Sequence, residues 1–553
     1  MPVTEQIDLP EGYYLDNFRQ LVSTVSERYP DLLEPADQSF LTRFRELSEP
    51  AARLLVRLYT RKGPVFRVNR LSYADVGPIE PAVAELVQTG LLDPAPLLTA
   101  LDIARLLTLP DLRQLPWCPD PRLNKAALLE HLAKMPDSGS PDDWQLAEPL
   151  VARCHDATLR RLQLMYFGNG RQSLTDFVLS DLGVFRYERY PLNRAQRWFQ
   201  DPADIDQTLH LMDLRDQYYE ATETKSTDPL PAIAQACLAT DWRPRVQDRA
   251  FRLMNQLGYR LEQAGHWSLA LALFNTNETP PARERRCRLL YKKERYTDCW
   301  DALQPILDAP QDASEARFGP RFQPRLARKL KRPVLSVLAP TVIENRVQWP
   351  PAAMSVEQLA CTQLEGAVWL ENQLPLAIFT LVHWPWLFAD VPGAFHHPFQ
   401  SGPADLYQPD FLQRRGTDRH HLYQTLTQTR ARQHLVHHSQ DKAGLQNPFF
   451  GWGGLSSELL LRCFDVVPWD HWVPIFRHLW LDLKRHRSGF PDLFQFRSDG
   501  YRFIEIKGPG DRLQDNQRDW LGVFSQAGVP AEVWYVEYTS DAGPETPADD
   551  TTP

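Results

Sequence analysis

The chain has 553 residues, and at ~150 residues per domain it is long enough for three or four domains. Hydrophobic residues make up 43% and charged residues 24% of the sequence, which is the composition of a folded globular protein and excludes general disorder. The net charge of -9 excludes a chain that is basic throughout, but binding to nucleic acid needs only a local positive surface.

Neither the N-terminus nor the cysteines indicate export. There is no apolar run of ~18 residues, and the segment MPVTEQIDLPEGYYL has neither the basic region nor the apolar core of a signal peptide. The cysteines, spread from Cys118 to Cys463 without a CxxC pair, favour reduced thiols over disulfides or a zinc site. We therefore expect a cytoplasmic protein.

Residues 1–90 are predicted to form a helical N-terminal domain. Apolar residues recur at helical spacing around Leu54 and Leu58, and this pattern breaks at Gly63 and Pro64. The interpretation that these residues support is a helical scaffold.

Residues 91–135 are predicted to form short helices separated by prolines, with Asn124 as the N-cap of the last helix. This arrangement resembles a SAP module, a helix-extended-helix DNA binder, in which Lys125 is the candidate DNA contact. A plain helical hairpin is the alternative. Residues 136–148 are rich in Pro, Gly, Ser and Asp without periodicity, which predicts a linker.

Helical periodicity returns in the segment 149–345, which is predicted to form a TPR-like helical domain. Residues 263–274 and 293–307 each have a Gly or Glu turn, an aromatic residue and an Ala/Leu stripe, as in the second helix of a TPR-like hairpin. Their aromatic anchors, Trp267 and Tyr296, are closer than the ~34 residues of a regular TPR array. Irregular pairs of helices are therefore expected.

The C-terminal segment contains the chemistry-bearing residues. Two β-rich runs, 490–496 and 501–506, are joined by a turn that contains Asp499 and Gly500, which predicts a β-hairpin. Because side chains alternate along a strand, Glu505 and its second neighbour along the strand, a lysine, project from one face and share a surface beside buried apolar strands.

On the opposite face of the second run, Ile504 and Ile506 are expected to enter a core. Asp492 precedes Glu505 by a hairpin length, so the two carboxylates can lie close together. Their repulsion raises one pKa unless a divalent cation lies between them. Hard oxygen ligands favour Mg²⁺ or Mn²⁺, and Lys507 beside such an ion can orient a water or stabilise developing charge. This chemistry is phosphodiester hydrolysis.

The Pro-Asp of the first run and the Glu-x-Lys of the second match the PD-(D/E)xK nuclease signature. The alternative is an edge hairpin with surface charges. Three features oppose it: Gly508 and Pro509 stop the strand, a helix begins near Asp515, and residues 531–538 supply a further strand. Gln517 opens the buried stripe of that helix and is expected to face the site.

These motifs resemble the VRR-NUC branch of the nuclease superfamily, and the resemblance extends upstream. Residues 355–407 look like the corresponding segment of Fanconi-associated nuclease, and 167–183 look like its helical region. The chain thus resembles a bacterial member over about residues 160 to 540. The resemblance implies cleavage of 5′-flap and branched DNA, as a 5′-exonuclease and flap endonuclease using Mg²⁺ or Mn²⁺, in interstrand crosslink repair. It also implies a nucleoid-associated location and the possibility of self-association on DNA.

In the family that the chain resembles, a further upstream glutamate completes the metal site. The family pattern, counted back from Trp384, selects Glu371 over Glu365. Glu371 is expected where a helix meets the break before Pro375, whereas Glu365 is expected to face solvent on a helix. The backbone carbonyl of Ile506 is carried over as another metal ligand.

DNA also needs a positive surface, and basic stretches supply candidates for it. The His434, His437 and His438 cluster has helical metal-ligand spacing, but without a carboxylate or cysteine pattern it does not predict zinc. The candidate DNA contacts are Lys125, Arg283, Arg286, Lys292, Arg325, Arg328, Lys484, Arg485 and Arg487.

The predicted fold is multidomain, with mostly α-helical N-terminal regions and a C-terminal α/β restriction-endonuclease-like domain over residues 355–540. The acidic, proline-rich residues 541–553 predict a disordered tail. The rival functions are a dimeric Holliday-junction resolvase of the same fold and a catalytically inactive scaffold that binds branched DNA.

Overall fold

The computed structural model describes residues 12–134, 138–146, 148–170, 172, 185–335, 341–453 and 455–539. Most of the segment 167–183 and the whole predicted tail therefore lie outside the described residues. The chain divides into two compact units, one of Met1–Phe185 with Leu192–Leu209 and the other of Arg186–Pro191 with His210–Pro553. The boundary near residue 209 falls inside the segment 149–345.

The first unit begins with helices, as predicted. Ser48 caps one of them by accepting the N–H of Ala51, and Phe18 and Phe44 pack edge to face in its core with ring centroids 4.8 Å apart. A small antiparallel sheet was not predicted, because its strands are too short to show a period of two. The helices are α1 (Tyr13–Arg28), α2 (Pro35–Arg45), α3 (Glu49–Thr60), η1 (Val68–Arg70), α4 (Ile79–Gln88) and α8 (Asp156–Phe167), and the strands are β1 (Val65–Arg67), β5 (Leu150–Arg153) and β2 (Leu92–Asp93).

The segment that resembles a SAP module forms its own small core. Its elements are β3 (Leu98–Thr99), α5 (Ala100–Leu106), α6 (Leu109–Arg113), α7 (Lys125–Leu132) and β4 (Ser138–Gly139). Asn124 caps α7 as predicted, since its side chain accepts the N–H of Ala127 at 2.9 Å. The linker prediction for 136–148 was wrong: β4 pairs with β3, and the buried indole of Trp144 donates to the carbonyl of Leu98 at 2.8 Å. Burial of that ring ties the segment to the core.

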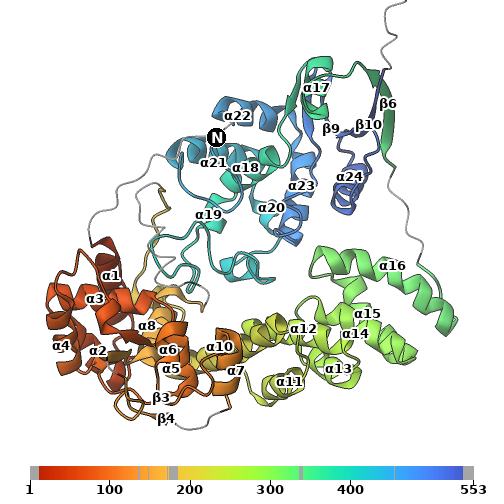
Figure 1. Ribbon diagram of the computed structural model, residues 1–553. Coiled ribbons are helices and arrows are strands. Elements are labelled where there is room, and N and C mark those ends of the chain that lie inside the picture. Colours follow the sequence, from red (N-terminus) through yellow and green to blue (C-terminus); the bar gives the residue numbers. More distant parts are fainter. Residues whose placement is uncertain are drawn as a thin grey trace, which may run out of the picture. The chain divides into compact units, whose positions relative to one another are not determined.

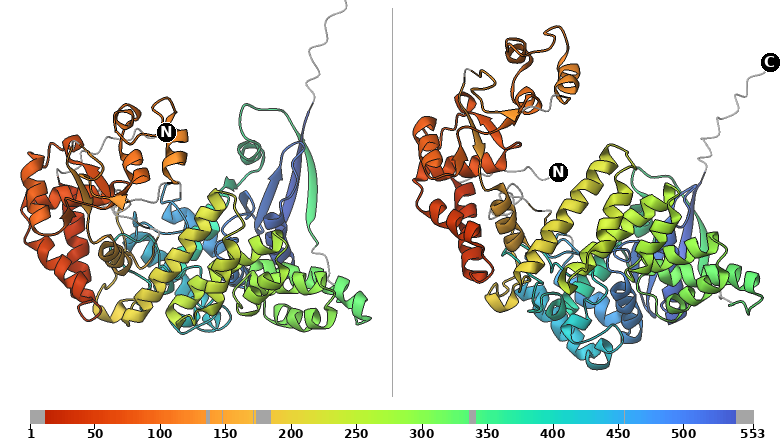
Figure 2. Two further views of the ribbon diagram at one scale, coloured as in Figure 1. Left: turned by 60° about the horizontal axis from the view of Figure 1, so that its bottom comes forward. Right: turned by 90° about the horizontal axis from the view of Figure 1, so that it is seen from below.

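The second unit begins with pairs of helices that lie side by side in chain order, as both views of Figure 2 show. The predicted second helices of the hairpins are present as α13 and α15. Each follows a turn with a residue at positive φ, Gly265 at 87° and Glu294 at 59°, which confirms the predicted Gly and Glu turns. The elements are α11 (Leu230–Ala239), α12 (Pro244–Gln263), α13 (Trp267–Asn275), α14 (Ala282–Lys292), α15 (Tyr296–Asp308) and α16 (Ala313–Leu330). Before them in the chain, η2 (Arg194–Gln196) belongs to the first unit, and the unit boundary falls within α10 (Pro202–Glu223).

The C-terminal part is built on a sheet of order β6-β10-β9-β8-β7 (Figure 1). The strands are β6 (Ile343–Trp349), β7 (Ala367–Trp369), β8 (Leu493–Arg497), β9 (Gly500–Lys507) and β10 (Ala531–Tyr538). The predicted hairpin is β8 and β9, and the predicted third strand is β10, which runs parallel to β9. Strands β6 and β7 were missed, so the sheet begins upstream of the predicted boundary at residue 355.

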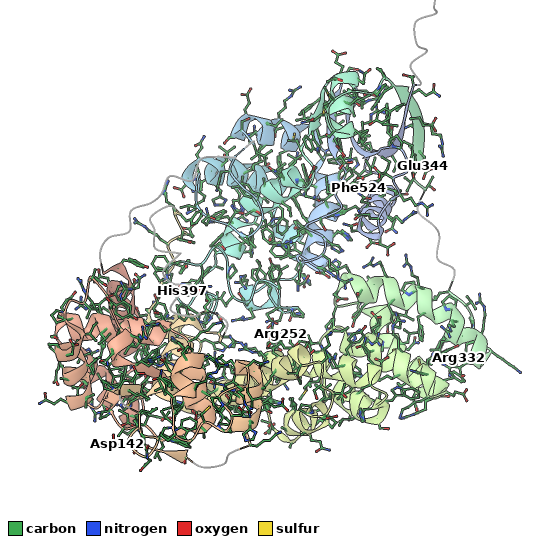
Figure 3. All side chains as sticks on the ribbon, viewed as in Figure 1. Asp142, Arg252, Arg332, Glu344, His397 and Phe524 are labelled. Atoms are coloured by element: carbon green, nitrogen blue, oxygen red, sulfur yellow. The ribbon has the colours of Figure 1, made fainter. Side chains whose placement is uncertain are left out.

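Helices cover both faces of this sheet. On one face, Leu359 of α17 (Val356–Gln363) packs with Ile504 and Ile506, which confirms that these isoleucines enter a core. On the other face Phe524 stacks on Phe503 at 5.3 Å between ring centroids, and Figure 3 labels Phe524 among the side chains there. The helices are α17 (Val356–Gln363), α18 (Gln373–Val382), α19 (Trp384–Leu387), η3 (Gln413–Arg415), α20 (Leu422–Thr425), α21 (Gln428–Asp441), α22 (Ser457–Val466), α23 (Trp469–Leu481) and α24 (Asp515–Ala527).

Among the helices of the described residues, none combines the length and the apolar character that a membrane span requires.

Candidate active site

The register of the hairpin brings Asp492 and Glu505 together. Leu493 pairs with Ile504, so Asp492, one residue before β8, lies beside Glu505 on β9. The side chain of Asp492 accepts the backbone N–H of Ile506 at 2.9 Å, which fixes its carboxylate against the middle of the second strand. The closeness that the hairpin predicted is therefore present.

The two carboxylates, Glu505 buried and Asp492 partly buried, are placed in a way that favours a bound cation. Glu505 has no exposed surface, and its Oε2 finds no donor among the residues that the structure describes. Burial and the nearby charge of Asp492 raise the pKa of Glu505 to about 8, and burial raises the pKa of Asp492 to about 6. A divalent ion placed between them would supply the missing partner and favour the charged form of both.

Lys507 and Gln517 hold the other side of Glu505. The ammonium of Lys507 lies 2.7 Å from Oε1 of Glu505, and Nε2 of Gln517 donates to the same oxygen at 2.6 Å. Oε1 of Gln517 accepts the backbone N–H of Gln514 at 2.8 Å, at the start of α24. Hydrogen bonds at both ends thus orient the Gln517 amide. Oε1 of Glu505 contacts two donors, whereas Oε2 is left without one among the described residues and can coordinate a cation.

Glu505 and Lys507 project from one face of β9, as predicted, but that face is covered. Glu505 is fully buried and Lys507 is 8% exposed, because α23 and α24 cover the face from which they project. Tyr501 and Phe503, on the same face of β9, belong to that covered core. The spacing of residues along one strand cannot show which helices pack over it, so the site is more enclosed than predicted.

Glu371 lies beside Asp492 through the backbone. Its N–H donates to the carbonyl of Asp492 at 2.9 Å, and so does the N–H of Leu370 at 3.1 Å. Glu371 has a φ of 42°, and its side chain is exposed. The predicted helix end at this position was wrong: α18 begins just after Glu371, and Pro375 lies in its first turn. The bend at Glu371 is present, but the positive φ produces it and the proline does not.

Glu365 is exposed, as expected, but it lies in the turn between α17 and β7 and not on a helix. Its carbonyl accepts from the side chain of Gln495 at 2.8 Å. A residue that the sequence did not reveal is Glu357, in the first turn of α17, whose charge raises the pKa of Asp492. Its proximity follows from the packing of α17 on the sheet, for which the sequence carries no local signal.

Across the described residues, no three His, Cys, Asp or Glu side chains already converge as a set of metal ligands. The structure places Asp492 and Glu505 together, with the carbonyl of Ile506 in the same strand as Glu505. The exposed side chain of Glu371, whose backbone is bonded to Asp492, must turn inward to join them. The donor set fits a hard cation because every candidate atom is oxygen.

Some of the candidate DNA contacts are held inside the protein. Lys125 donates to the carbonyl of Leu107 at 2.8 Å, and Arg286 donates to the carbonyl of Phe274 at 2.8 Å. Arg283 is buried and lies 3.4 Å from Glu315. These cations bond to neighbouring elements of the protein. A run of basic residues in the sequence does not show which of them are engaged in this way.

The remaining candidates are more accessible. Lys292 and Arg325 line a cavity on the helical pairs, whereas Arg328, Lys484, Arg485 and Arg487 are exposed. The last three follow α23 and lead into the hairpin that carries Asp492.

The histidines of α21 serve packing. Nδ1 of His434 lies 2.9 Å from the carbonyl of Val382, and Nδ1 of His438 lies 2.6 Å from that of Leu381. Both rings therefore fasten α21 to α18, and His437 is exposed.

The fold and the site define a class of protein. A mixed sheet brings Asp492, just before β8, next to Glu505 and Lys507 on β9, and a helix against that sheet donates to the Glu. This is the arrangement of the PD-(D/E)xK nucleases, which use a divalent metal ion.

Comparison with known proteins identifies the family. The profile of the VRR-NUC domain matches residues 426–538, and that of the FAN1, HTH domain matches residues 12–93. A Fanconi-associated nuclease 1 homolog of Pseudomonas aeruginosa is 36% identical over 96% of this chain and 97% of its own length. An Arabidopsis thaliana homolog is 25% identical over 95% of this chain and 67% of its own.

A solved structure agrees with these relatives. The crystal structure of paFAN1 bound to 2-nucleotide 5′-flap DNA with a gap has a TM-score of 0.80 at 35% identity, covering 97% of this chain and 100% of that one. The complex of the same protein with a 1-nucleotide 5′ flap has a TM-score of 0.78. The chain belongs to the Fanconi-associated nuclease 1 family and is a nuclease.

Proposed function

We propose that this nuclease hydrolyses phosphodiester bonds in 5′-flap and branched DNA during DNA repair, with interstrand crosslink repair as the pathway. The observation that carries the proposal is the pair of Asp492, partly buried, and Glu505, fully buried, with Oε2 of Glu505 left without a donor among the described residues. The preference for a 5′ flap is supported by the family, since the similar paFAN1 structures hold 5′-flap DNA.

The proposed metal is Mg²⁺ or Mn²⁺, held by Asp492, Glu505, the carbonyl of Ile506 and Glu371. These are hard oxygen donors, and both ions prefer such ligands. When bound, the ion would polarise the phosphodiester and lower the pKa of a water. The protein supplies the enclosure, because the buried strands exclude bulk water from the carboxylates and strengthen electrostatic interactions there.

Lys507 and Gln517 have distinct proposed roles. The ammonium of Lys507 orients the attacking water or stabilises negative charge on the phosphorus as it becomes five-coordinate. Gln517 is a positioning residue that keeps Oε1 of Glu505 engaged. The exposed cations Lys484, Arg485 and Arg487 are placed to contact phosphates near the hairpin.

We propose the following domain organisation. Residues 1–90 form a helical domain, 91–135 a SAP-like module and 149–345 a TPR-like domain, followed by the nuclease domain over 355–540. The pairing of β3 with β4 supports a C-terminal extension of the module, and the pairing of β6 with β10 supports an N-terminal extension of the nuclease domain.

The deciding experiment compares Asp492→Asn and Glu505→Gln with the unchanged protein on labelled 5′-flap DNA, with Mg²⁺ or Mn²⁺. Each variant should cleave more than about 10²-fold more slowly, because each removes a metal ligand, while binding of the flap DNA persists. Asp499→Asn is the matched control, since Asp499 is exposed in the turn of the same hairpin. Cleavage by Asp492→Asn within tenfold of the unchanged protein would refute the assigned site.

A four-way junction in the same assay tests the rival resolvase function. The proposed flap nuclease should leave intact junctions largely uncut. Symmetric cleavage of the junction by a dimer would favour the resolvase instead.

A further inference from the structure

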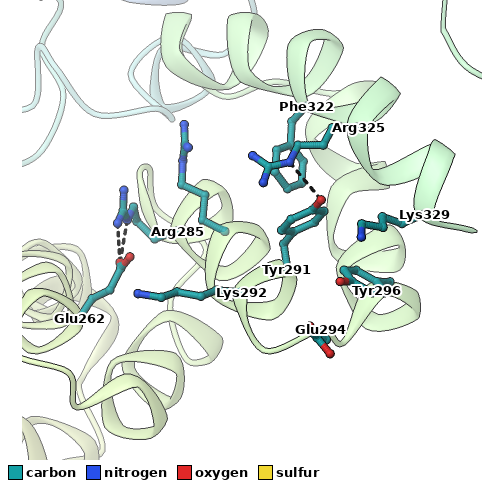
Figure 4. A pocket seen from close by; sticks show the side chains of 10 residues that line it. Glu262, Arg285, Tyr291, Lys292, Glu294, Tyr296, Phe322, Arg325 and Lys329 are labelled. Carbon is teal, nitrogen blue, oxygen red and sulfur yellow. Dashed lines mark hydrogen bonds and ion pairs between the residues drawn. The ribbon is translucent and has the colours of Figure 1, made fainter.

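A basic groove lies on the helical pairs, between α14, α15 and α16 (Figure 4). It has a volume of about 530 Å³. The residues that line it are Glu262, Arg285, Arg288, Tyr291, Lys292, Glu294, Tyr296, Phe322, Arg325 and Lys329. We call this the α14–α16 groove.

The cations of the groove outnumber its carboxylates. Arg285 is paired with Glu262 at 2.5 Å, and Arg288 is paired with Glu284 at 2.8 Å. Lys292, Lys329 and Arg325 form no ion pair with any residue that the structure describes. Their charges are available to an anion, opposed only by Glu294, which is exposed at a turn.

These three cations alternate with aromatic rings. Lys292 lies 3.9 Å from the ring centroid of Trp267, and Arg325 lies 4.5 Å from that of Tyr291. Lys329 lies 5.6 Å from the ring centroid of Tyr296. Tyr291 and Tyr296 line the groove and are half-buried, so each keeps an accessible edge or face there.

The groove continues toward the catalytic helix. A second cavity of about 380 Å³ shares Arg288, Phe322 and Arg325 with it and is also lined by Asp515, the first residue of α24. Gln517, two residues further along that helix, donates a hydrogen bond to Glu505. A DNA strand that follows the two cavities therefore reaches the start of α24, the helix whose Gln517 bonds to Glu505.

We propose that the α14–α16 groove binds an unpaired strand of the DNA substrate and leads it to the active site. Cations neutralise its phosphates, and exposed bases stack on the tyrosines, which every base can do regardless of sequence. Duplex DNA keeps its bases stacked inward and cannot use the rings. An acidic peptide would use the cations but needs no continuity with α24, so the single strand is favoured. The inference rests on the proposed function.

The test measures binding of a fluorescent oligodeoxythymidine of 20 nucleotides and of a duplex of equal length, in EDTA so that nothing is cleaved. The double variant Lys292→Gln with Lys329→Gln should bind the single strand about tenfold more weakly. Its salt dependence should fall by about 1.4 in log–log slope, since each phosphate contact contributes ~0.7. Duplex binding should change much less.

The matched control removes two neighbouring charges from the same helix ends. Lys293 and Lys331 do not line either cavity, and Lys293 instead bonds to Ser268 at 3.0 Å. Lys293→Gln with Lys331→Gln should bind like the unchanged protein. An equal loss of single-strand affinity in both double variants would show a general effect of surface charge and would overturn the proposal that the groove binds the strand.

The aromatic part of the proposal has its own test. Tyr296→Leu should weaken single-strand binding by about tenfold, whereas Tyr296→Phe, which keeps the ring, should not. The proposal fails if Tyr296→Leu binds the single strand normally and if a polyglutamate peptide displaces the oligonucleotide from the unchanged protein but not from the Lys292→Gln with Lys329→Gln variant. In that case the groove is a peptide site. Flap cleavage by Asp492→Asn is measured separately, so failure of the groove leaves the nuclease assignment intact.

Discussion

Burial determines the chemistry available to Glu505. Burial and the charge of Asp492 raise the pKa of Glu505, so this carboxyl group holds its proton more readily than an exposed glutamate does. Lys507 opposes this, because its ammonium favours the charged form of Glu505 from 2.7 Å. Removing Lys507 should therefore affect both the catalytic step and the charge of Glu505.

Lys507→Met tests which effect dominates. If the ammonium acts on water or on the phosphorus, the cleavage rate should fall by about 10²-fold or more at saturating metal. The metal concentration for half-maximal activity should stay within a few fold. Titration of cleavage against Mn²⁺ gives both quantities. A parallel loss of metal affinity and rate would assign Lys507 to a structural role.

The choice between Glu371 and Glu365 can be made by the same titration. Glu371→Gln should need at least about tenfold more Mn²⁺ for half-maximal activity, since a ligand is lost. Glu365→Gln should behave like the unchanged protein, because its side chain is exposed in a turn. The opposite result would move the site to Glu365 and leave Asp492 and Glu505 in place.

Among the residues of the site, the sequence predicted the positions of those that are set by spacing along a single hairpin or helix. The hairpin spacing brought Asp492 and Glu505 together, and the helical stripe oriented Gln517 toward them. Glu357 and the internal pairing of Arg283 depend on packing between distant helices. No pattern along the chain records that packing, so both could be recognised only in the folded protein.

At the scale of elements, a close contact positions α24 against the loop that precedes Asp492. Gly489 has a φ of 86°, and a Cβ there would lie 2.7 Å from the side chain and 2.9 Å from the backbone of Asn516. Gly510 has a φ of 88°, but a Cβ there would meet nothing within 4 Å. The two glycines share a conformation and differ in the space around them.

Comparing Gly489→Ala with Gly510→Ala therefore separates the cost of a left-handed backbone, which both variants bear, from the cost of a steric clash with Asn516, which only Gly489→Ala bears. Gly510→Ala should lose about 1–2 kcal/mol of stability from the left-handed backbone alone. Gly489→Ala should lose about 1–3 kcal/mol more from overpacking, and should cleave flaps more slowly because α24 and Gln517 shift. Urea unfolding and a flap assay measure the two effects. Equal losses in both variants would show that the contact with Asn516 is unimportant.

The elements that the sequence predicted are those with local signals. The β8–β9 hairpin has an Asp-Gly turn, and α24 has a helical apolar stripe. Strand β6 was missed, and the predicted helical domain ended within it at residue 345, because the strand is short and mostly exposed. Its only neighbour in the sheet is β10, far away in the sequence, so nothing nearby indicates a strand.

At the scale of the whole molecule, buried histidines link stability to pH. Burial lowers the pKa of His383 to about 3 and that of His438 to about 4, and both bond to backbone carbonyls. A folded-state pKa below the unfolded value of about 6.5 contributes stability that is full above pH 6.5 and is lost as the pH falls.

Acidification from pH 7 to 5.5 should thus destabilise the protein by about 1 kcal/mol for each of these histidines. Calorimetric unfolding temperatures measured across this range report the loss. His438→Gln should flatten the pH dependence, because Gln does not titrate. The neighbouring His437→Gln is the control, since His437 is exposed. A profile that His438→Gln leaves unchanged would contradict the linkage.

The position of β10 has a consequence for synthesis of the protein. β10 follows the other four strands of its sheet in the sequence, yet it lies between β6 and β9 in the sheet. Until residues 531–538 leave the ribosome, the strand that carries Glu505 has an unpaired edge and β6 has no partner in the sheet. A nascent chain therefore cannot complete its cutting centre before residues 531–538 have emerged, and a product truncated before them lacks the strand that closes it.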